Sequence, residues 1–281
     1  MVGTVYELNI NYCFTGRVLF ILKILVTNED GIFSAGVIAL SELLSHFGKV
    51  TVICPQNSDY INNVKTSLNR PLSLKKVEYS DTIEAYSVDA SPSECVKLGI
   101  EEITDGYPDF VFSGINLGAN VGRDAFKSPS TRAIEEAFLH DIPAAAIAID
   151  EFNACNINFS KIKDTIYELL SNLMNKNLPN RSVFNINIPN EAKSNIKGLK
   201  VLPMDTNVSK YRFKKLISLD SGIYYFLEDT KDSFQYNKRS DVFYIQQNYI
   251  IISPIVLRNT CDNELESYQN WFEELQHEST Q

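Results

Sequence analysis

The stretch Ile24-Leu25-Val26-Thr27-Asn28-Glu29-Asp30-Gly31 decides the fold of this chain. It begins as a short, unbroken apolar run and ends in polar residues and an Asp-Gly turn signal, which is typical of a buried parallel strand passing into a loop. Residues 36–47 then carry apolar side chains at helical spacing, and Val50 to Cys54 form a second apolar run closed by Pro55. The pattern predicts a strand-helix-strand unit with parallel strands and a right-handed crossover.

The same alternation continues along the chain. We predict a third strand at Phe110 to Phe112 that runs into a loop at Ser113 to Asn116, a helix over 129–139, and a fourth buried strand over 144–149. Repeated strand, loop and helix indicate an α/β fold with a doubly wound (Rossmann-like), mostly parallel sheet. Ligands of such sheets bind at the carboxyl ends of the strands, where both polar loops are expected.

The last third of the chain has a different pattern. A helix is predicted from about Ile162 to Met174 and a half-buried alternating strand over 183–190. Residues 200–257 then alternate with β-branched and aromatic residues, including 222–227, 242–245 and 249–252, and residues 263–276 are predicted to form a terminal helix. We divide the chain into an extension of unclear role (1–22), an α/β core with the active site (23–190) and a β-rich and helical oligomerisation region (191–281).

Composition narrows the classes of function. The 281 residues are 44% hydrophobic, enough for a full core, and the formal net charge of −9 argues against a duplex nucleic acid as partner. Five scattered cysteines form no C-x-x-C pair, so neither a disulfide framework nor a thiolate zinc site is indicated, and a reducing cytoplasm is expected. The apolar stretch from Val18 to Val26 contains Lys23 and is too short to span a membrane.

Polar residues after the first and third strands are the candidates for chemistry. Glu29 and Asp30 are adjacent carboxylates, and Asn116 offers a neutral amide oxygen at the same sheet edge, a donor set that suits Mg²⁺ or Mn²⁺. A solvated turn or a helix N-cap is the alternative reading of the acidic pair.

An anion site is predicted beside these residues. The segment from Gly114 to Gly122 is rich in glycine, which would let backbone N–H groups approach a phosphate, and hydroxyls precede the helix that follows. The predicted phosphate and substrate contacts are Asn28, Gly118, Asn120, Ser128 and Ser130.

Five ordered segments resemble the SurE family. They are 24–36 with the acidic loop, 91–96 (Ser-Pro-Ser-Glu-Cys-Val), 108–124 with Ser113-Gly114-Ile115-Asn116, 184–190, and Ser240-Asp241 followed by 249–254. The resemblance implies a doubly wound core with a dimerising C-terminal region, forming a homodimer or homotetramer. It also implies hydrolysis of nucleoside 5′- and 3′-monophosphates that depends on one divalent metal.

Carried over residue by residue, Glu29 and Asp30 match the family's two acidic metal ligands, Asn116 its asparagine ligand, and Ser128 a serine of its phosphate loop. Asp30 is the better candidate for accepting a proton from the attacking water.

The chain departs from the family pattern at three places. Glu29 stands where the family has aspartate, and Pro129 replaces a glycine of the phosphate loop. The family's serine ligand after the second strand has no clear counterpart: Asn62, Tyr60 and Ser58 are alternatives, of which Asn62 offers an amide oxygen. A SurE-like protein that has lost turnover and binds nucleotide or serves in assembly is therefore the alternative function. The hypothesis of a dinucleotide-dependent oxidoreductase is rejected because no G-x-G-x-x-G motif follows the first strand.

Overall fold

The computed structural model describes residues 21–56, 67–176, 178–207, 211–217, 222–229, 239–257 and 265–266. The strands of the main sheet are β1 (Leu22–Thr27), β2 (Gly48–Pro55), β3 (Leu74–Ser80), β4 (Ile83–Val88), β5 (Phe110–Leu117), β6 (Ala144–Ile149), β7 (Val183–Ile188), β8 (Leu199–Val201) and β11 (Ile250–Ile255). The helices are α1 (Ala35–Leu44), α2 (Pro92–Leu98), α3 (Pro129–Leu139), α4 (Phe159–Met174) and α5 (Asp241–Ile245). Short turns of helix lie at Gly99–Ile103, Gly122–Lys127, Ala154–Asn156 and Lys193–Asn195.

The nine strands form one mixed, mostly parallel sheet in the order β3-β4-β2-β1-β5-β6-β7-β11-β8. From β1 the chain builds outward through β2 and β4 on one side and through β5, β6 and β7 on the other. The direction of winding therefore reverses between β1 and β5. In doubly wound folds this switch point opens a crevice at the carboxyl ends of the strands.

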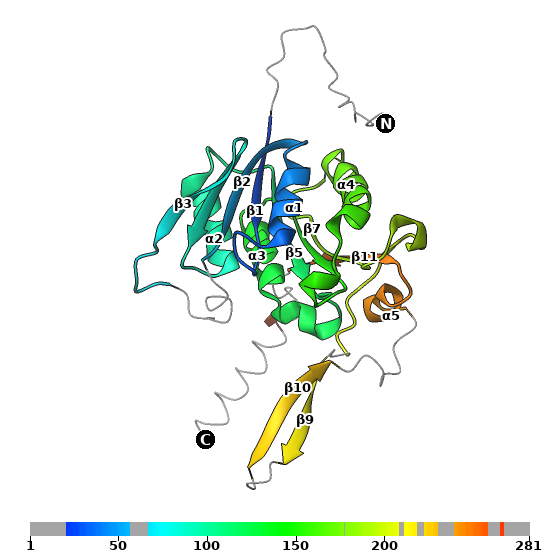
Figure 1. Ribbon diagram of the computed structural model, residues 1–281. Coiled ribbons are helices and arrows are strands. Elements are labelled where there is room, and N and C mark those ends of the chain that lie inside the picture. Colours follow the sequence, from blue (N-terminus) through cyan, green and yellow to red (C-terminus); the bar gives the residue numbers. More distant parts are fainter. Residues whose placement is uncertain are drawn as a thin grey trace.

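Helices cover both faces of the sheet (Figure 1). Ile24 and Val26 of β1 pack with α1 and α4 on one face, whereas Leu25 packs with α2 and α3 on the other. Side chains of successive strand residues point to opposite faces, so a strand covered on both faces must be apolar throughout. The run from Ile24 to Val26 is apolar for this reason.

The predicted α/β class and the doubly wound, mostly parallel sheet are confirmed. Helix α3 matches the prediction to the residue, and the predicted strand-helix-strand unit is β1-α1-β2. None of the described helices is long and apolar enough to cross a membrane.

Three local predictions are wrong. Residues 113–116 do not form a loop, because β5 continues to Leu117 and keeps its pairing with β6 across a register shift between Gly114 and Asn116. Strand β7 is almost fully buried, not half-buried, because Ile186 and Ile188 pack in the core and the segment with Asn120 lies against Asn185 and Asn187. Residues 242–245 are helical because the Ser240 hydroxyl accepts a hydrogen bond from the backbone N–H of Phe243 and caps α5.

Strands β3 and β4 and helix α2 were not predicted. Helix α2 has a capping box in which the Ser91 hydroxyl and the Glu94 carboxylate each bond the other residue's backbone N–H, with Pro92 in the first turn. The largely polar β3 and the alternating β4 are strands through pairing: β4 pairs with β2, and β3 pairs with β4.

The C-terminal region contributes to both sheets. Strands β8 and β11 complete one end of the main sheet, and β9 (Tyr211–Ile217) and β10 (Ile223–Asp229) form an antiparallel hairpin that projects from the body (Figure 1). The predicted helix over 263–276 lies outside the described residues except for Leu265 and Glu266, as does nearly all of the 1–22 extension. The division of the chain at 22 and 190 stays a prediction.

Candidate active site at the switch point

The acidic loop after β1 is shaped by Asn28. Its buried amide donates hydrogen bonds to the Gly31 carbonyl (3.0 Å) and the Ser34 hydroxyl (2.6 Å), and its oxygen accepts one from the Gly31 N–H (3.1 Å). Gly31 has φ of 90°, a conformation that favours glycine, and Ser34 also caps α1. Asn28 was predicted to contact the substrate; because both of its N–H donors are used within the loop, it instead holds the loop that presents Glu29 and Asp30.

The two carboxylates of the loop differ in exposure. Asp30 is exposed at the rim, and partial desolvation raises its pKa. Glu29 is half-buried; desolvation first, and the neighbouring Asp30 charge second, raise its pKa to about 7. Near neutral pH a large fraction of Glu29 is therefore protonated, and a bound cation would favour its ionised form.

Ser130 connects Glu29 to Asn116. The Ser130 hydroxyl donates to a Glu29 carboxylate oxygen (3.2 Å) and accepts a hydrogen bond from the Asn116 amide nitrogen. The Ser130 backbone N–H is bonded to the hydroxyl of Ser128, which caps α3 (3.2 Å). The first turn of α3 and the ends of β1 and β5 therefore meet at one place, although the predicted Ser113 to Asn116 loop is a strand.

The glycine-rich segment after β5 does not present its backbone as predicted. The Gly118 N–H bonds the Glu151 carbonyl (2.9 Å), the Asn120 N–H bonds Asn187 Oδ1 (2.7 Å), and the Gly122 N–H bonds Asp241 Oδ2 (2.7 Å). A Cβ at Gly118, where φ is 86°, would lie 2.2 Å from the Phe152 ring, so this glycine allows close packing. These N–H groups have internal partners and do not cradle a phosphate. The Nδ2 of the Asn120 side chain is buried and has no partner among the described residues.

Three buried residues hold this segment in place and were not predicted as site residues. Asn185 and Asn187 of β7 both donate to the Asn120 carbonyl, at 2.7 Å and 3.0 Å. Asp241 accepts from Gly122 and also from the N–H groups of Asp205 and Val242, both at 2.9 Å. The sequence did point to these residues: the segments 184–190 and Ser240-Asp241 resemble the family, although the resemblance gave them no role in the site.

The residues present fit a divalent cation. Oδ1 of Asn116 is fully buried and lacks a hydrogen-bond partner within the described ranges, which is costly unless a cation or water occupies the space before it. Glu29, reached through Ser130, adds a carboxylate, and Asp30 is its neighbour in the loop. The described chain has no cluster of three His, Cys, Asp or Glu side chains suited to a metal, so this site depends on an amide oxygen. Asn62, Tyr60 and Ser58 lie outside the described residues, which leaves the fourth ligand a prediction.

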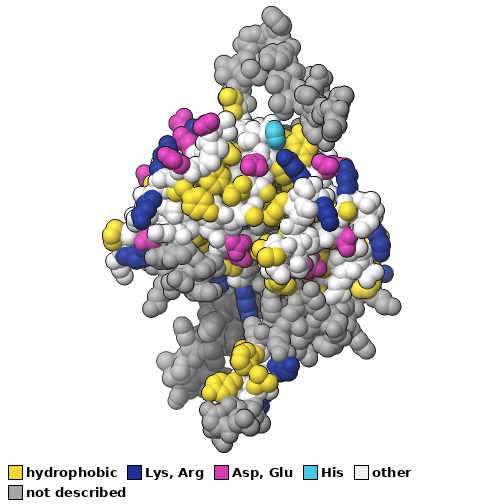
Figure 2. All heavy atoms as spheres, viewed as in Figure 1, with side chains coloured by type: hydrophobic (Ala, Val, Ile, Leu, Met, Phe, Trp, Pro, Cys, Tyr) yellow, Lys and Arg dark blue, Asp and Glu magenta, His cyan; other side chains and the backbone are white. Residues whose placement is uncertain are grey.

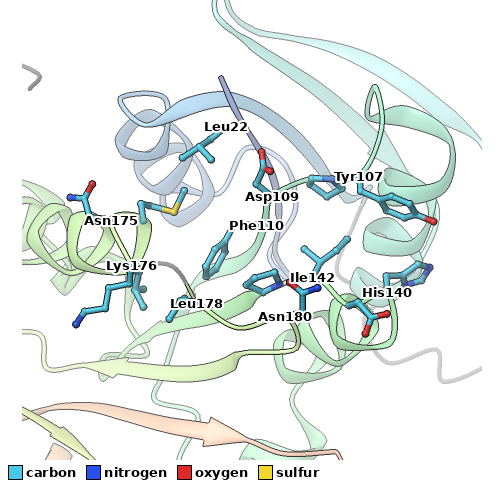
Figure 3. A pocket seen from close by; sticks show the side chains of 15 residues that line it. Leu22, Tyr107, Asp109, Phe110, His140, Ile142, Asn175, Lys176, Leu178 and Asn180 are labelled. Atoms are coloured by element: carbon cyan, nitrogen blue, oxygen red, sulfur yellow. The ribbon is translucent and has the colours of Figure 1, made fainter. Parts of the chain in front are cut away.

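Two cavities lie at opposite ends of the sheet. One of about 620 Å³ opens beside the acidic loop and is lined by Asp30 together with residues of β3 and β4. The other, of about 640 Å³, lies at the amino ends of β1 and β5, where Leu22, Phe110 and Ile142 line it (Figure 3). Of the two, only the first includes a carboxylate of the acidic loop, Asp30, and none of its lining residues belongs to β5.

Comparison with known proteins identifies the family. The model of the family Survival protein SurE matches residues 24–211. The chain belongs to the SurE family. Over 250 residues it is 33% identical to the 5′-nucleotidase SurE of Thermoanaerobacter sp. (strain X514), a match that covers 89% of this chain and 98% of that protein. The 5′-nucleotidase SurE of Clostridium botulinum (strain 657 / Type Ba4) is 30% identical over 251 residues, with 89% and 99% covered.

A solved SurE structure agrees with the fold. The crystal structure of the SurE protein from Aquifex aeolicus superposes with a TM-score of 0.76 at 27% identity, covering 89% of this chain and 99% of that one. The resemblance inferred from the motifs is thereby confirmed.

Proposed function

We propose that this SurE-family chain is a metal-dependent phosphomonoester hydrolase that releases phosphate from nucleoside 5′- and 3′-monophosphates. One observation carries the proposal: at the switch point the Ser130 hydroxyl joins the carboxylate of Glu29, the neighbour of Asp30 in the loop, to the side chain of Asn116, whose buried oxygen has no partner among the described residues. The relatives named 5′-nucleotidase SurE, matched over nearly their whole length, support the choice of substrate.

In this proposal the residues of the chain have separate tasks. Glu29, Asp30 and Asn116 hold a divalent cation, Mg²⁺ or Mn²⁺, which supplies Lewis-acid stabilisation of the phosphoryl charge. Asp30, exposed at the rim, accepts the proton of a water that attacks phosphorus while the ester P–O bond breaks and the nucleoside oxygen takes up a proton. The Asn120 amide and the Ser128 hydroxyl orient the phosphate from the other side, and Ser130, whose O–H is donated to Glu29, positions Glu29 and Asn116.

A phosphate-release assay tests the proposal. We expect purified protein to release inorganic phosphate from a panel of nucleoside monophosphates in Mn²⁺ or Mg²⁺ and to lose this activity in a chelator. Both 5′- and 3′-monophosphates belong in the panel, with a nucleoside diphosphate for comparison. An absence of metal-dependent release from every member would refute the enzyme, and tight nucleotide binding without release would favour the alternative of a SurE-like binding protein.

We also propose that the chain assembles as a homodimer or homotetramer through its hairpin. Strands β9 and β10 expose large hydrophobic side chains, which gather at the projecting end of the molecule (Figure 2). The exposed residues there are Phe213 (74%), Leu216 (44%), Ile223 (56%), Tyr224 (51%), Tyr225 (61%) and Phe226 (53%). An isolated two-stranded hairpin is marginal in water, and such a patch normally marks an interface. Sedimentation equilibrium at micromolar concentration should give a dimer or tetramer, and a monomer would contradict this.

A further inference from the structure

The cavity beside the acidic loop contains residues that the proposed chemistry does not use. Asp30, Gly31, Ile32, Phe33 and Ser34 form its rim on the side of the acidic loop. The remaining lining residues come from the end of β2 and from β3 and β4: Gln56, Lys75, Lys76, Val77 and Ser87. The volume of about 620 Å³ lies within the range of sites that bind small molecules.

Phe33 is the feature that most needs an explanation. It is 68% exposed, three residues after Asp30, in the turn before α1. Single exposed aromatic residues are ordinary on protein surfaces. This one lies at the rim of the cavity that is also lined by Asp30, the proposed proton acceptor.

The charge of the cavity differs from that of the whole protein. Lys75 and Lys76 line it with Asp30 as the acidic member, but successive strand residues point to opposite faces, and the Lys76 ammonium lies over the Tyr86 ring, 5.8 Å from its centroid. Lys75 is therefore the cation that balances Asp30 in this cavity of a chain with net charge −9. Both lysines are exposed on the edge strand β3. A local cation attracts an anion that the overall field of the protein would repel.

From this arrangement we propose that the cavity is the nucleoside subsite, in which the base of a nucleoside monophosphate stacks on Phe33 while Lys75 attracts the anion. The inference rests on the proposed function, since it uses the same phosphate position. Stacking is tolerant of base identity because every base has a π-face. The subsite therefore selects nucleotides over phosphomonoesters without a base, and selects weakly among bases.

The test compares two phosphomonoesters in Mn²⁺: AMP, and ribose 5-phosphate, which lacks the base. In Phe33→Ala we expect kcat/KM for AMP to fall about tenfold through KM, within the range that base stacking contributes. The value for ribose 5-phosphate should stay within about twofold, and Phe33→Tyr should retain the preference for AMP. Tyr107→Ala is the matched control, because Tyr107 is also 68% exposed but lines the cavity at the other end of the sheet.

Equilibrium binding of the same two ligands separates this inference from the proposed function. If the wild-type protein releases no phosphate but binds AMP more tightly than ribose 5-phosphate, and Phe33→Ala removes the difference, the enzyme proposal fails and the subsite stands. An equal effect of Phe33→Ala on both ligands, no effect on AMP, or no binding of AMP by the wild-type protein would overturn the subsite.

Discussion

Replacing Asp30 with asparagine is expected to lower kcat/KM for a nucleoside monophosphate by about a thousandfold, the middle of the range attributed to general acid–base catalysis. The substitution keeps the size of the side chain but removes the carboxylate that is proposed to accept the proton of the attacking water. It also removes one negative ligand, so metal affinity should fall. Phosphate release at saturating Mn²⁺ separates the two losses, because excess metal restores binding without restoring the proton acceptor.

Asp109→Asn is the matched control for this prediction. Asp109 is an exposed aspartate at the amino end of β5, where it accepts a hydrogen bond from the Lys23 N–H (2.7 Å), at the other end of the sheet from Asp30. The same chemical change there should leave kcat/KM within about twofold, as expected for a surface position away from the site. If Asp30→Asn retains more than a tenth of the wild-type rate at saturating metal, Asp30 is not the proton acceptor.

Replacing Asp241 with alanine is expected to destabilise the protein by about 3 kcal/mol or more, because each buried donor left without a partner costs about 1–3 kcal/mol. Asp241 is fully buried and accepts three backbone hydrogen bonds, from Gly122, Asp205 and Val242. Burial raises its pKa, and these three hydrogen bonds act in the opposite direction. Chemical denaturation measures the loss of stability.

The same substitution should also reduce activity under conditions where the protein stays folded. The hydrogen bond from the Gly122 N–H to Asp241 helps to fix the segment that contains Asn120. Loss of this bond should therefore loosen the proposed phosphate contact of Asn120. Asp109→Ala removes an aspartate that also accepts a backbone N–H, but at an exposed site, and should cost less than about 1 kcal/mol. Equal stability of the two alanine variants would show that the Asp241 network is not a structural requirement.

Much of the fold could be predicted from the sequence because short stretches of residues specify these strands and helices locally. The apolar run of β1, the helical spacing of α1 and the proline and hydroxyl at the start of α3 specify their own conformations. The acidic loop was found in the same way, since a strand that ends in Asn-Glu-Asp-Gly places carboxylates at the edge of the sheet.

Other parts depended on contacts between distant residues. Asn116 reaches the site from within β5, and the strand continues there because β6 lies beside it. Strands β3 and β4 exist through their pairing with each other and with β2. No local pattern contains such information.

The sequence by itself determined the family, the doubly wound core and the residues Glu29, Asp30 and Asn116 as candidates. Only the tertiary structure decided which polar groups remain available for a ligand. Asn28 and the N–H groups of the glycine-rich segment use their hydrogen-bonding capacity internally, whereas the Asn116 oxygen has no partner in the part of the chain that the structure describes. The physical reason is that a buried polar group must find a partner, and the partner is supplied by whichever strand or helix the fold brings beside it.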